Sequence, residues 1–192
     1  MLSFDDVDRN PQALEEFTRT LTLNDLRRMT NETIDEMLRR ASKCQDADVV
    51  FQPSDPEAHD TYAATPEEVS IAWTLGHVIV HTTASSEESA ALAAEHARGV
   101  RHHGRSRYEV PWQGVATIQE CRVRLEESRR MLLASLDMWP DEPHRENVST
   151  FIPEWPKLNA VSRFLVGLMH DQEHFGQIAD IVSQARRARG AA

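Results

Sequence analysis

The chain has 192 residues, of which 40% are hydrophobic and 27% charged, a size and composition typical of one globular domain with its own core. Its formal net charge of −10 disfavours binding to nucleic acid and to anionic membrane surfaces. We therefore expect a single domain over residues 1–192 that binds neither.

The N-terminal sequence and the cysteines bear on the compartment. The first ten residues, MLSFDDVDRN, are acidic where a secretory signal would be basic and then apolar. No stretch approaches the roughly 18 consecutive apolar residues of a membrane span. Cys44 and Cys121 lie far apart and form no CxxC pair, which indicates two reduced thiols. We expect a cytoplasmic protein without a membrane segment.

Helical periodicity dominates the first half of the chain, and no run alternates in the manner of a strand. The pattern predicts a short helix from Pro11 and a longer helix over about 23–43, with Asn24 as its cap. A connection of about 30 residues follows. The next helix has two candidate starts, the capping-box pattern TPEE at 65–68 and Thr74; we favour Thr74, with the end just before Gly99.

Two further helices are predicted over about 115–138 and 158–187, separated by a loop of about 19 residues rich in proline and tryptophan. Four helices of at least 20 residues each reach roughly 30 Å or more, the length of a small bundle. The fold class is therefore all-α, a four-helix bundle. The connections of about 30 and 19 residues are long enough to cross over the bundle.

Histidines recur at helical spacing in two of these helices. The stretch LMHDQEHFGQI, residues 168–178, places His170 and His174 one turn apart, so their rings can meet at a common point, as in zinc sites. Alone, this pair also fits the solvated face of an amphipathic helix. The stretch WTLGHVIVHTTA adds His77 and His81, again one turn apart. Three imidazoles with an open position suit zinc, nickel, iron or copper.

Two metal-site alternatives fail on their spacing. A di-iron bundle needs glutamates with ExxH pairs, which are absent. The HDQEH segment matches the HxxEH pattern of zinc peptidases with Glu173 as base, but no glutamate follows among the last 18 residues to complete that site. Glu88, two turns after His81, has the phase to approach the site, although we expect it to be exposed.

The segment Trp73-Thr74-Leu75-Gly76, the histidine at 81 and the segment HDQEHFGQI resemble the DinB/YfiT-like superfamily of metal-dependent enzymes. The resemblance implies a helical bundle that holds one divalent metal ion, zinc, nickel or iron, through His81, His170 and His174. It favours His81 over His77 because His81 lies eight residues after the tryptophan, where the family's ligand falls.

The same resemblance leaves other roles open. Gly176 and Gln177 match a Gly-Gln pair of the family, and Gln177 is a candidate to orient a ligand or the substrate. His77 is a proton-transfer group near the metal, a residue that supports a metal ligand, or a polar packing residue. Arg101 and Arg105, in the basic loop after residue 98, are candidates to receive an anionic substrate or thiol cofactor; the alternative is a solvated loop.

The function implied by the resemblance is hydrolysis, or transfer of a low-molecular-weight thiol such as mycothiol or bacillithiol, with a small molecule as substrate. One alternative is a non-catalytic stress-response bundle that sequesters a small molecule and holds a structural metal. Another is a partner-binding helical protein with surface histidines. Pairing of two copies through helix faces is a further expectation.

Overall fold

The computed structural model describes residues 2–60, 63, 65–104 and 111–190. Its helices are α1 (Phe4–Arg9), α2 (Gln12–Thr18), α3 (Leu23–Arg40), α4 (Asp46–Val49), α5 (Leu75–Ala97), the 3-10 turn η1 (Trp112–Gly114), α6 (Ile118–Asp137), α7 (Ala160–Glu173) and α8 (Phe175–Ala188). Within these ranges no strand forms, and a single isolated bridge joins Ser149 to Leu158. The all-α prediction is confirmed.

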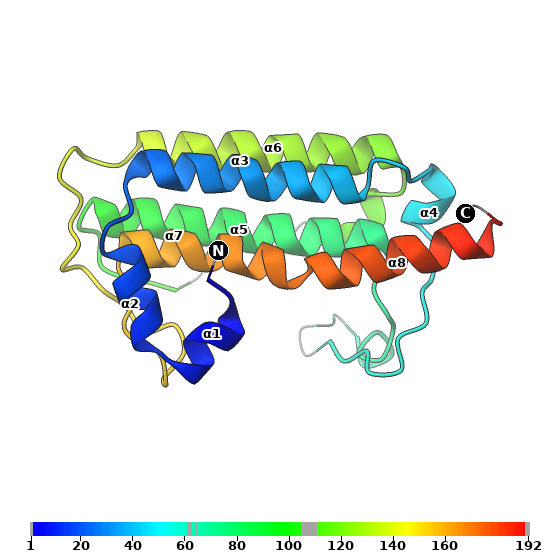
Figure 1. Ribbon diagram of the computed structural model, residues 1–192, viewed down its shortest axis with the longest axis horizontal. Coiled ribbons are helices and arrows are strands. Elements are labelled where there is room, and N and C mark those ends of the chain that lie inside the picture. The colour runs from blue at the N-terminus through cyan, green and yellow to red at the C-terminus, as the bar shows by residue number, and fades with distance from the viewer. Residues whose placement is uncertain (1, 61–62, 64, 105–110, 191–192) are drawn as a thin grey trace.

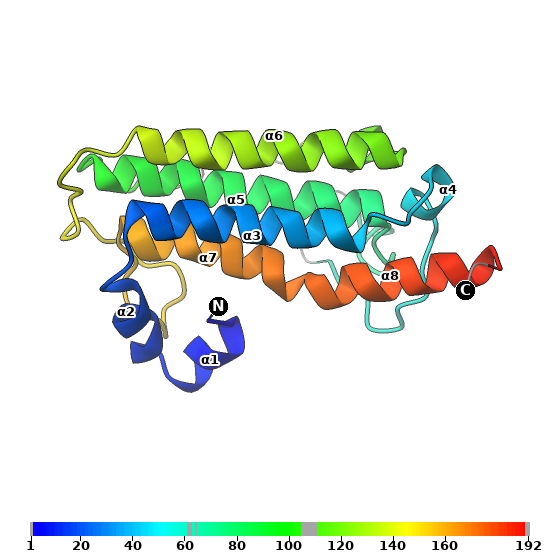
Figure 2. The same ribbon diagram turned by 45° about the horizontal axis from the view of Figure 1, so that its top comes forward.

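Four long rods form the bundle: α3, α5, α6 and the pair α7–α8 (Figures 1 and 2). Helix α5 lies at the centre, packs against both α6 and α7, and is buried along nearly all of its length. It runs antiparallel to α3 and α7 but parallel to α6 (Figure 1). The crossover is therefore the connection 98–117 between α5 and α6, while the connections 41–74 and 138–159, where we expected crossovers, join neighbouring helix ends.

Side-chain caps fix where the helices begin. The Thr74 hydroxyl accepts a hydrogen bond from the backbone N–H of His77 at 3.2 Å, so α5 starts as predicted, and residues 65–70 form turns. At its other end Gly99 adopts a φ of +80°, which only glycine adopts without strain. The cap predicted at Asn24 is wrong. Thr22 caps α3 instead, since it and Asp25 bond each other's backbone N–H groups at 3.2 and 3.0 Å.

The last rod is interrupted at His174, so the single helix predicted over 158–187 is wrong. The backbone N–H of His174 donates to the carbonyl of Gln172, two residues back, and α8 begins at Phe175. Figure 2 shows the bend between α7 and α8 at this point. As a result, His174 lies at a corner of the chain rather than inside a regular helix.

The centre of α5 carries buried carboxylates. Glu87 forms a two-point ion pair with Arg124 of α6, with N···O distances of 2.7 and 2.8 Å, and Glu88 is only 8% exposed. The expectation that Glu88 is exposed is wrong, because most of α5 is buried in the bundle and Arg163 of α7 lies near that carboxylate. These charges therefore belong to the packed interior.

Close packing brings the segment before α6 onto the start of α5. A Cβ at Gly76 would collide with the backbone oxygen of Val115, so only glycine permits this contact. The contact places η1 beside the first turns of α5. Along the described chain no helix combines the length and apolarity needed to cross a bilayer.

Candidate metal centre

Three histidines from two helices and one helix junction converge. His81 lies in the second turn of α5, His170 in the last turn of α7, and His174 at the α7–α8 corner. One nitrogen of each ring lies within 4.8 Å of the others, and the Nε2 atoms of His81 and His170 are 3.1 Å apart. All three are partly buried. The alternative of a solvated helix face therefore does not describe these side chains.

The orientation of the His174 ring is fixed by the next turn. Its Nδ1 lies 2.7 Å from the amide oxygen of Gln177, which can only accept a hydrogen bond. The proton therefore resides on Nδ1, and Nε2 keeps its lone pair for a metal. This places Gln177, a predicted site residue, in direct contact with a histidine of the cluster.

Burial keeps the rings of His170 and His174 neutral. It lowers the pKa of His170 to about 3, with further lowering from the neighbouring His174 and His81. The pKa of His174 is also lowered by burial, against an opposing effect of its hydrogen bond to Gln177. At pH 7 both rings are therefore uncharged, the state in which imidazole binds a metal.

The donor set fits a divalent transition metal. Two imidazole nitrogens on one tetrahedral zinc ion, each at about 2.05 Å, are about 3.3 Å apart, close to the 3.1 Å between His81 and His170. In the described part of the chain this is the one group of histidine, cysteine and carboxylate donors compatible with a metal ion. The zinc-peptidase alternative needs Glu173 as its general base. It is disfavoured as well, because the Glu173 carboxylate accepts a hydrogen bond from the backbone N–H of Phe4.

His77 does not join the three histidines. Its ring is stacked between two indoles, with ring centroids 4.5 Å from Trp73 and 4.6 Å from Trp112, at interplanar angles of 26° and 5°. Trp73 in turn packs against His81 and His174, with ring centroids 4.5 and 5.9 Å away. His77 lies one aromatic ring away from the three clustered histidines, a position that fits either a packing role or a proton-transfer role.

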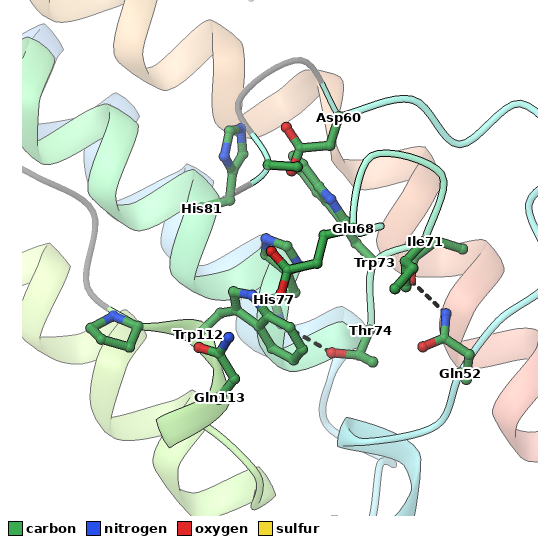
Figure 3. A pocket seen from close by; sticks show the side chains of 13 residues that line it. Gln52, Asp60, Glu68, Ile71, Trp73, Thr74, His77, His81, Trp112 and Gln113 are labelled. Atoms are coloured by element: carbon green, nitrogen blue, oxygen red, sulfur yellow. Dashed lines mark hydrogen bonds between the residues drawn. The ribbon is translucent and has the colours of Figure 1, made fainter. Parts of the chain in front are cut away.

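A cavity of about 510 Å³ opens beside the cluster (Figure 3). Its lining residues come from the loop before α5, the start of α5 and the segment before α6: Gln52, Asp60, Ala63, Glu68, Ile71, Ala72, Trp73, Thr74, His77, His81, Pro111, Trp112 and Gln113. A smaller cavity of about 190 Å³ is lined by His174 and Gln177 and shares the lining residues Asp60, Ile71 and Trp73 with the larger one. The size suits a small organic molecule.

Hydrogen bonds hold the loop that forms this wall. The Gln52 amide donates to the carbonyl of Ala72 at 2.6 Å, and the backbone N–H of Asp60 donates to the carbonyl of Val69 at 2.8 Å. The Gln184 side chain of α8 bonds both the N–H and the carbonyl of Ser54, at 2.9 and 3.1 Å. The loop is thus fixed to itself and to α8.

Of the two predicted arginines only Arg101 is among the described residues, and it does not lie at the cluster. Arg101 follows the C-terminal end of α5, and the 16 residues from His81 to Ala97 alone span about 24 Å along the helix. Arg101 therefore lies toward the opposite end of the bundle, and Arg105 is outside the described residues. Sequence reasoning missed Asp60, Glu68 and Trp112 as site residues, because they lie on loops whose course no periodicity reveals.

Comparison with known proteins gives one match. A family model described as the DinB superfamily matches residues 6–178, most of the chain and all three histidines of the cluster. No curated protein and no solved structure matches.

Proposed function

The chain belongs to the DinB superfamily, and we propose that it is a metal-dependent enzyme that acts on a small molecule through zinc, nickel or iron held by His81, His170 and His174. The observation that carries this proposal is the convergence of three imidazoles beside a cavity of about 510 Å³. Three imidazole ligands would leave a coordination position for solvent or substrate, as in catalytic rather than structural zinc sites.

The nucleophile is expected to come from outside the chain. A metal ion in this site would lower the pKa of a water molecule or a thiol toward neutrality. The protein's own thiols are unsuited, because burial raises the pKa of Cys44 and raises that of Cys121 to about 12. The proposed reaction is therefore hydrolysis, or transfer of a low-molecular-weight thiol of the mycothiol or bacillithiol kind.

Other side chains have supporting roles in this proposal. Gln177 holds the His174 ring with Nε2 directed away from its own hydrogen bond. Trp73 covers the rings of His81 and His174 on one side and limits the access of bulk water. His77, in the cavity wall, is a candidate to take up or return a substrate proton.

Metal analysis of the purified protein tests the proposal. We expect about one divalent transition metal ion per chain, and loss of that metal in His174→Ala. The matched control is His103→Ala, since His103 is a half-exposed histidine paired with Glu95 outside the cluster. A wild-type protein that folds normally and binds no zinc, nickel or iron would refute the proposal, as would equal metal content in the two variants.

A second measurement separates an enzyme from a non-catalytic bundle with a structural metal. After cobalt substitution, an open coordination position gives an absorption change when azide or a thiol is added. An unchanged spectrum with mycothiol, bacillithiol, glutathione and azide would favour sequestration of a small molecule. Turnover assays with the same thiols then distinguish transferase from hydrolase.

A further inference from the structure

The bend between α7 and α8 puts His174 at a corner of the chain, and the local sequence does not account for it. Between residues 160 and 188 there is no proline, and no side chain caps the start of α8. Gly176 lowers the local preference for helix but fixes no direction. A sharp bend in a helical rod needs a physical cause. Contacts from other elements must therefore hold the corner.

Arg40, the last residue of α3, holds the residue that follows His174. Its Nη1 donates a hydrogen bond to the carbonyl oxygen of Phe175 at 2.9 Å, and its guanidinium carbon lies 4.9 Å from the centroid of the Phe175 ring. One side chain thus binds both the backbone and the ring of Phe175, through a charged hydrogen bond and a cation–π contact. Figure 2 shows the C-terminal end of α3 beside the first turns of α8.

The Arg40 side chain is itself held in place. Its Nε lies 2.8 Å from Oε1 of Glu36, one turn earlier in α3, and only 24% of the side chain is exposed. The planar guanidinium can therefore contact Glu36 with one edge and Phe175 with another. Little side-chain freedom is left, so the position of Phe175 is well defined.

On the α7 side the corner has longer hydrogen bonds. The backbone N–H of Phe4 donates to the Glu173 carboxylate at 3.2 Å, and the Gln172 amide donates to the Thr33 hydroxyl at 3.4 Å. Hydrogen bonds weaken at these lengths. The bond from Arg40 is the shortest of the three and has a charged donor, so we expect it to contribute most.

The place of this bond matters for the histidine cluster. Phe175 follows His174 directly, so a rotation of the chain at the corner would swing the His174 ring away from its partners. We propose that Arg40 is a positioning residue for His174, which it keeps directed at His81 and His170 by holding Phe175. This inference rests on the proposed function, because it concerns a ligand of the same metal centre.

The zinc affinity of matched variants tests the inference. Arg40→Met removes the donor and the charge but keeps a long side chain over the Phe175 ring, and we expect zinc to bind about tenfold more weakly. Arg39→Met is the control, since Arg39 pairs with the same Glu36, at 2.5 and 2.6 Å, through a side chain that is 67% exposed. It should keep wild-type affinity. Competition with a fluorescent zinc chelator measures both, and equal affinities would overturn the inference.

A rescue and a spectrum separate positioning from a general loss of stability. A residue that only stabilises the fold would lower the free energy of unfolding without changing the zinc affinity of the folded protein. Arg40→Lys keeps a charged donor and is expected to regain most of the affinity. Cobalt-loaded Arg40→Met should show shifted visible bands, because these report ligand geometry; unshifted bands would contradict the inference. If Arg40→Met does not fold, Arg40→Gln takes its place with the same expectations.

Hydrogen exchange in the metal-free protein tests the corner without the metal. The backbone N–H of Ile178 donates to the His174 carbonyl at 2.9 Å, so its exchange rate reports the first turn of α8. We expect exchange about tenfold faster in Arg40→Met and unchanged in Arg39→Met.

The two proposals fail in different ways. A wild-type protein that binds no metal would refute the proposed function and, with it, the ligand-positioning role, even where faster exchange shows that Arg40 holds the corner. A wild-type protein that binds zinc, with equal exchange and equal zinc affinity in Arg40→Met and Arg39→Met, would overturn this inference alone.

Discussion

Histidines gather at both ends of α5, but among the described residues only those at its start converge with histidines of other elements. At the start of the helix, the ring of His81 meets those of His170 and His174 from the α7–α8 rod. Near its end, His96 is 1% exposed and both of its ring nitrogens are buried without a hydrogen-bond partner. The neighbouring ring of His102 lies 5.8 Å away in an edge-on arrangement. Convergence of donor atoms from several elements therefore distinguishes a metal centre from a histidine-rich segment.

The two ends differ in what covers them. The start of α5 faces a cavity bounded by the loop before it and by η1. The far end is closed by the connection between α6 and α7, where the Asn147 amide donates to the His96 carbonyl at 3.1 Å and the His144 N–H donates to the Ala97 carbonyl at 3.0 Å. A ligand has access at one end, and a neutral buried side chain is sealed in at the other.

The largest expected effect is the loss of metal affinity in His81→Ala. Removing one of three protein ligands leaves two, and we expect affinity to fall by about a hundredfold or more. His96→Leu, at the other end of the same helix, is expected to keep the wild-type metal stoichiometry. Competition with a fluorescent zinc chelator measures both. Similar losses in the two variants would mean that the ends are not distinct.

Substitution of Gln177 should have the next largest effect. Gln177→Leu removes the acceptor that holds the His174 ring, and we expect metal affinity to fall by about 10- to 100-fold. Gln177→Glu retains an acceptor oxygen and should preserve most of the affinity. If both variants bind metal alike, the hydrogen bond does not position the ligand.

Gly76→Ala tests the packing that forms the cavity. Its Cβ would meet the backbone oxygen of Val115, so we expect a loss of about 1–3 kcal/mol in the free energy of unfolding. Gly176→Ala, where nothing lies within 4 Å of the new Cβ, is the control and should be neutral or slightly stabilising. Chemical denaturation measures both, and a Gly76→Ala variant as stable as wild type would show that η1 can shift freely.

The smallest expected effect is a pH dependence of the free energy of unfolding, caused by His96 near the C-terminal end of α5. Burial lowers the pKa of His96, with contributions in the same direction from His102 and Arg163 and an opposing one from Glu95. The unfolded chain therefore binds the proton more readily than the folded chain. The resulting stability is present above the unfolded pKa of about 6.5 and is lost as pH falls toward the folded pKa, by at most about 1.4 kcal/mol per pH unit.

Comparing metal-free wild type with His96→Leu isolates this contribution, because the three site histidines are common to both. The difference in unfolding free energy between the two proteins should change between pH 7 and pH 5, with wild type losing more stability on acidification. A difference independent of pH would contradict the sealed, neutral state of His96.

Much of the bundle could be predicted because its helix ends depend on local chemistry. Thr74 and Gly99 bound α5 as expected, since a hydroxyl cap and a positive φ are readable from residue type. The break at His174 could not be predicted, because neither proline nor a cap precedes it. We also expected crossovers in the connections 41–74 and 138–159. The length of a loop does not show whether it joins neighbouring or opposite ends of the bundle.

The convergence of the three histidines could also be predicted, while their binding of a metal stays a prediction. Two HxxxH pairs indicated a metal centre, and the resemblance selected His81, which the structure brings to His170 and His174. The structure places His77 in a stack with Trp73 and Trp112 instead. Glu68 and Trp112 gave no periodic signal, because their approach depends on how two loops fold back onto α5. The wall of the larger cavity could therefore be described only from the three-dimensional structure.

X-ray absorption of the zinc-loaded wild-type protein tests the three-histidine centre most directly. We expect one zinc ion per chain with nitrogen or oxygen neighbours at about 2.0–2.1 Å and the outer scattering of three imidazole rings. Sulfur at about 2.3 Å would instead place the metal on Cys44 or Cys121. That result, or scattering without three imidazoles, would contradict a centre built from His81, His170 and His174.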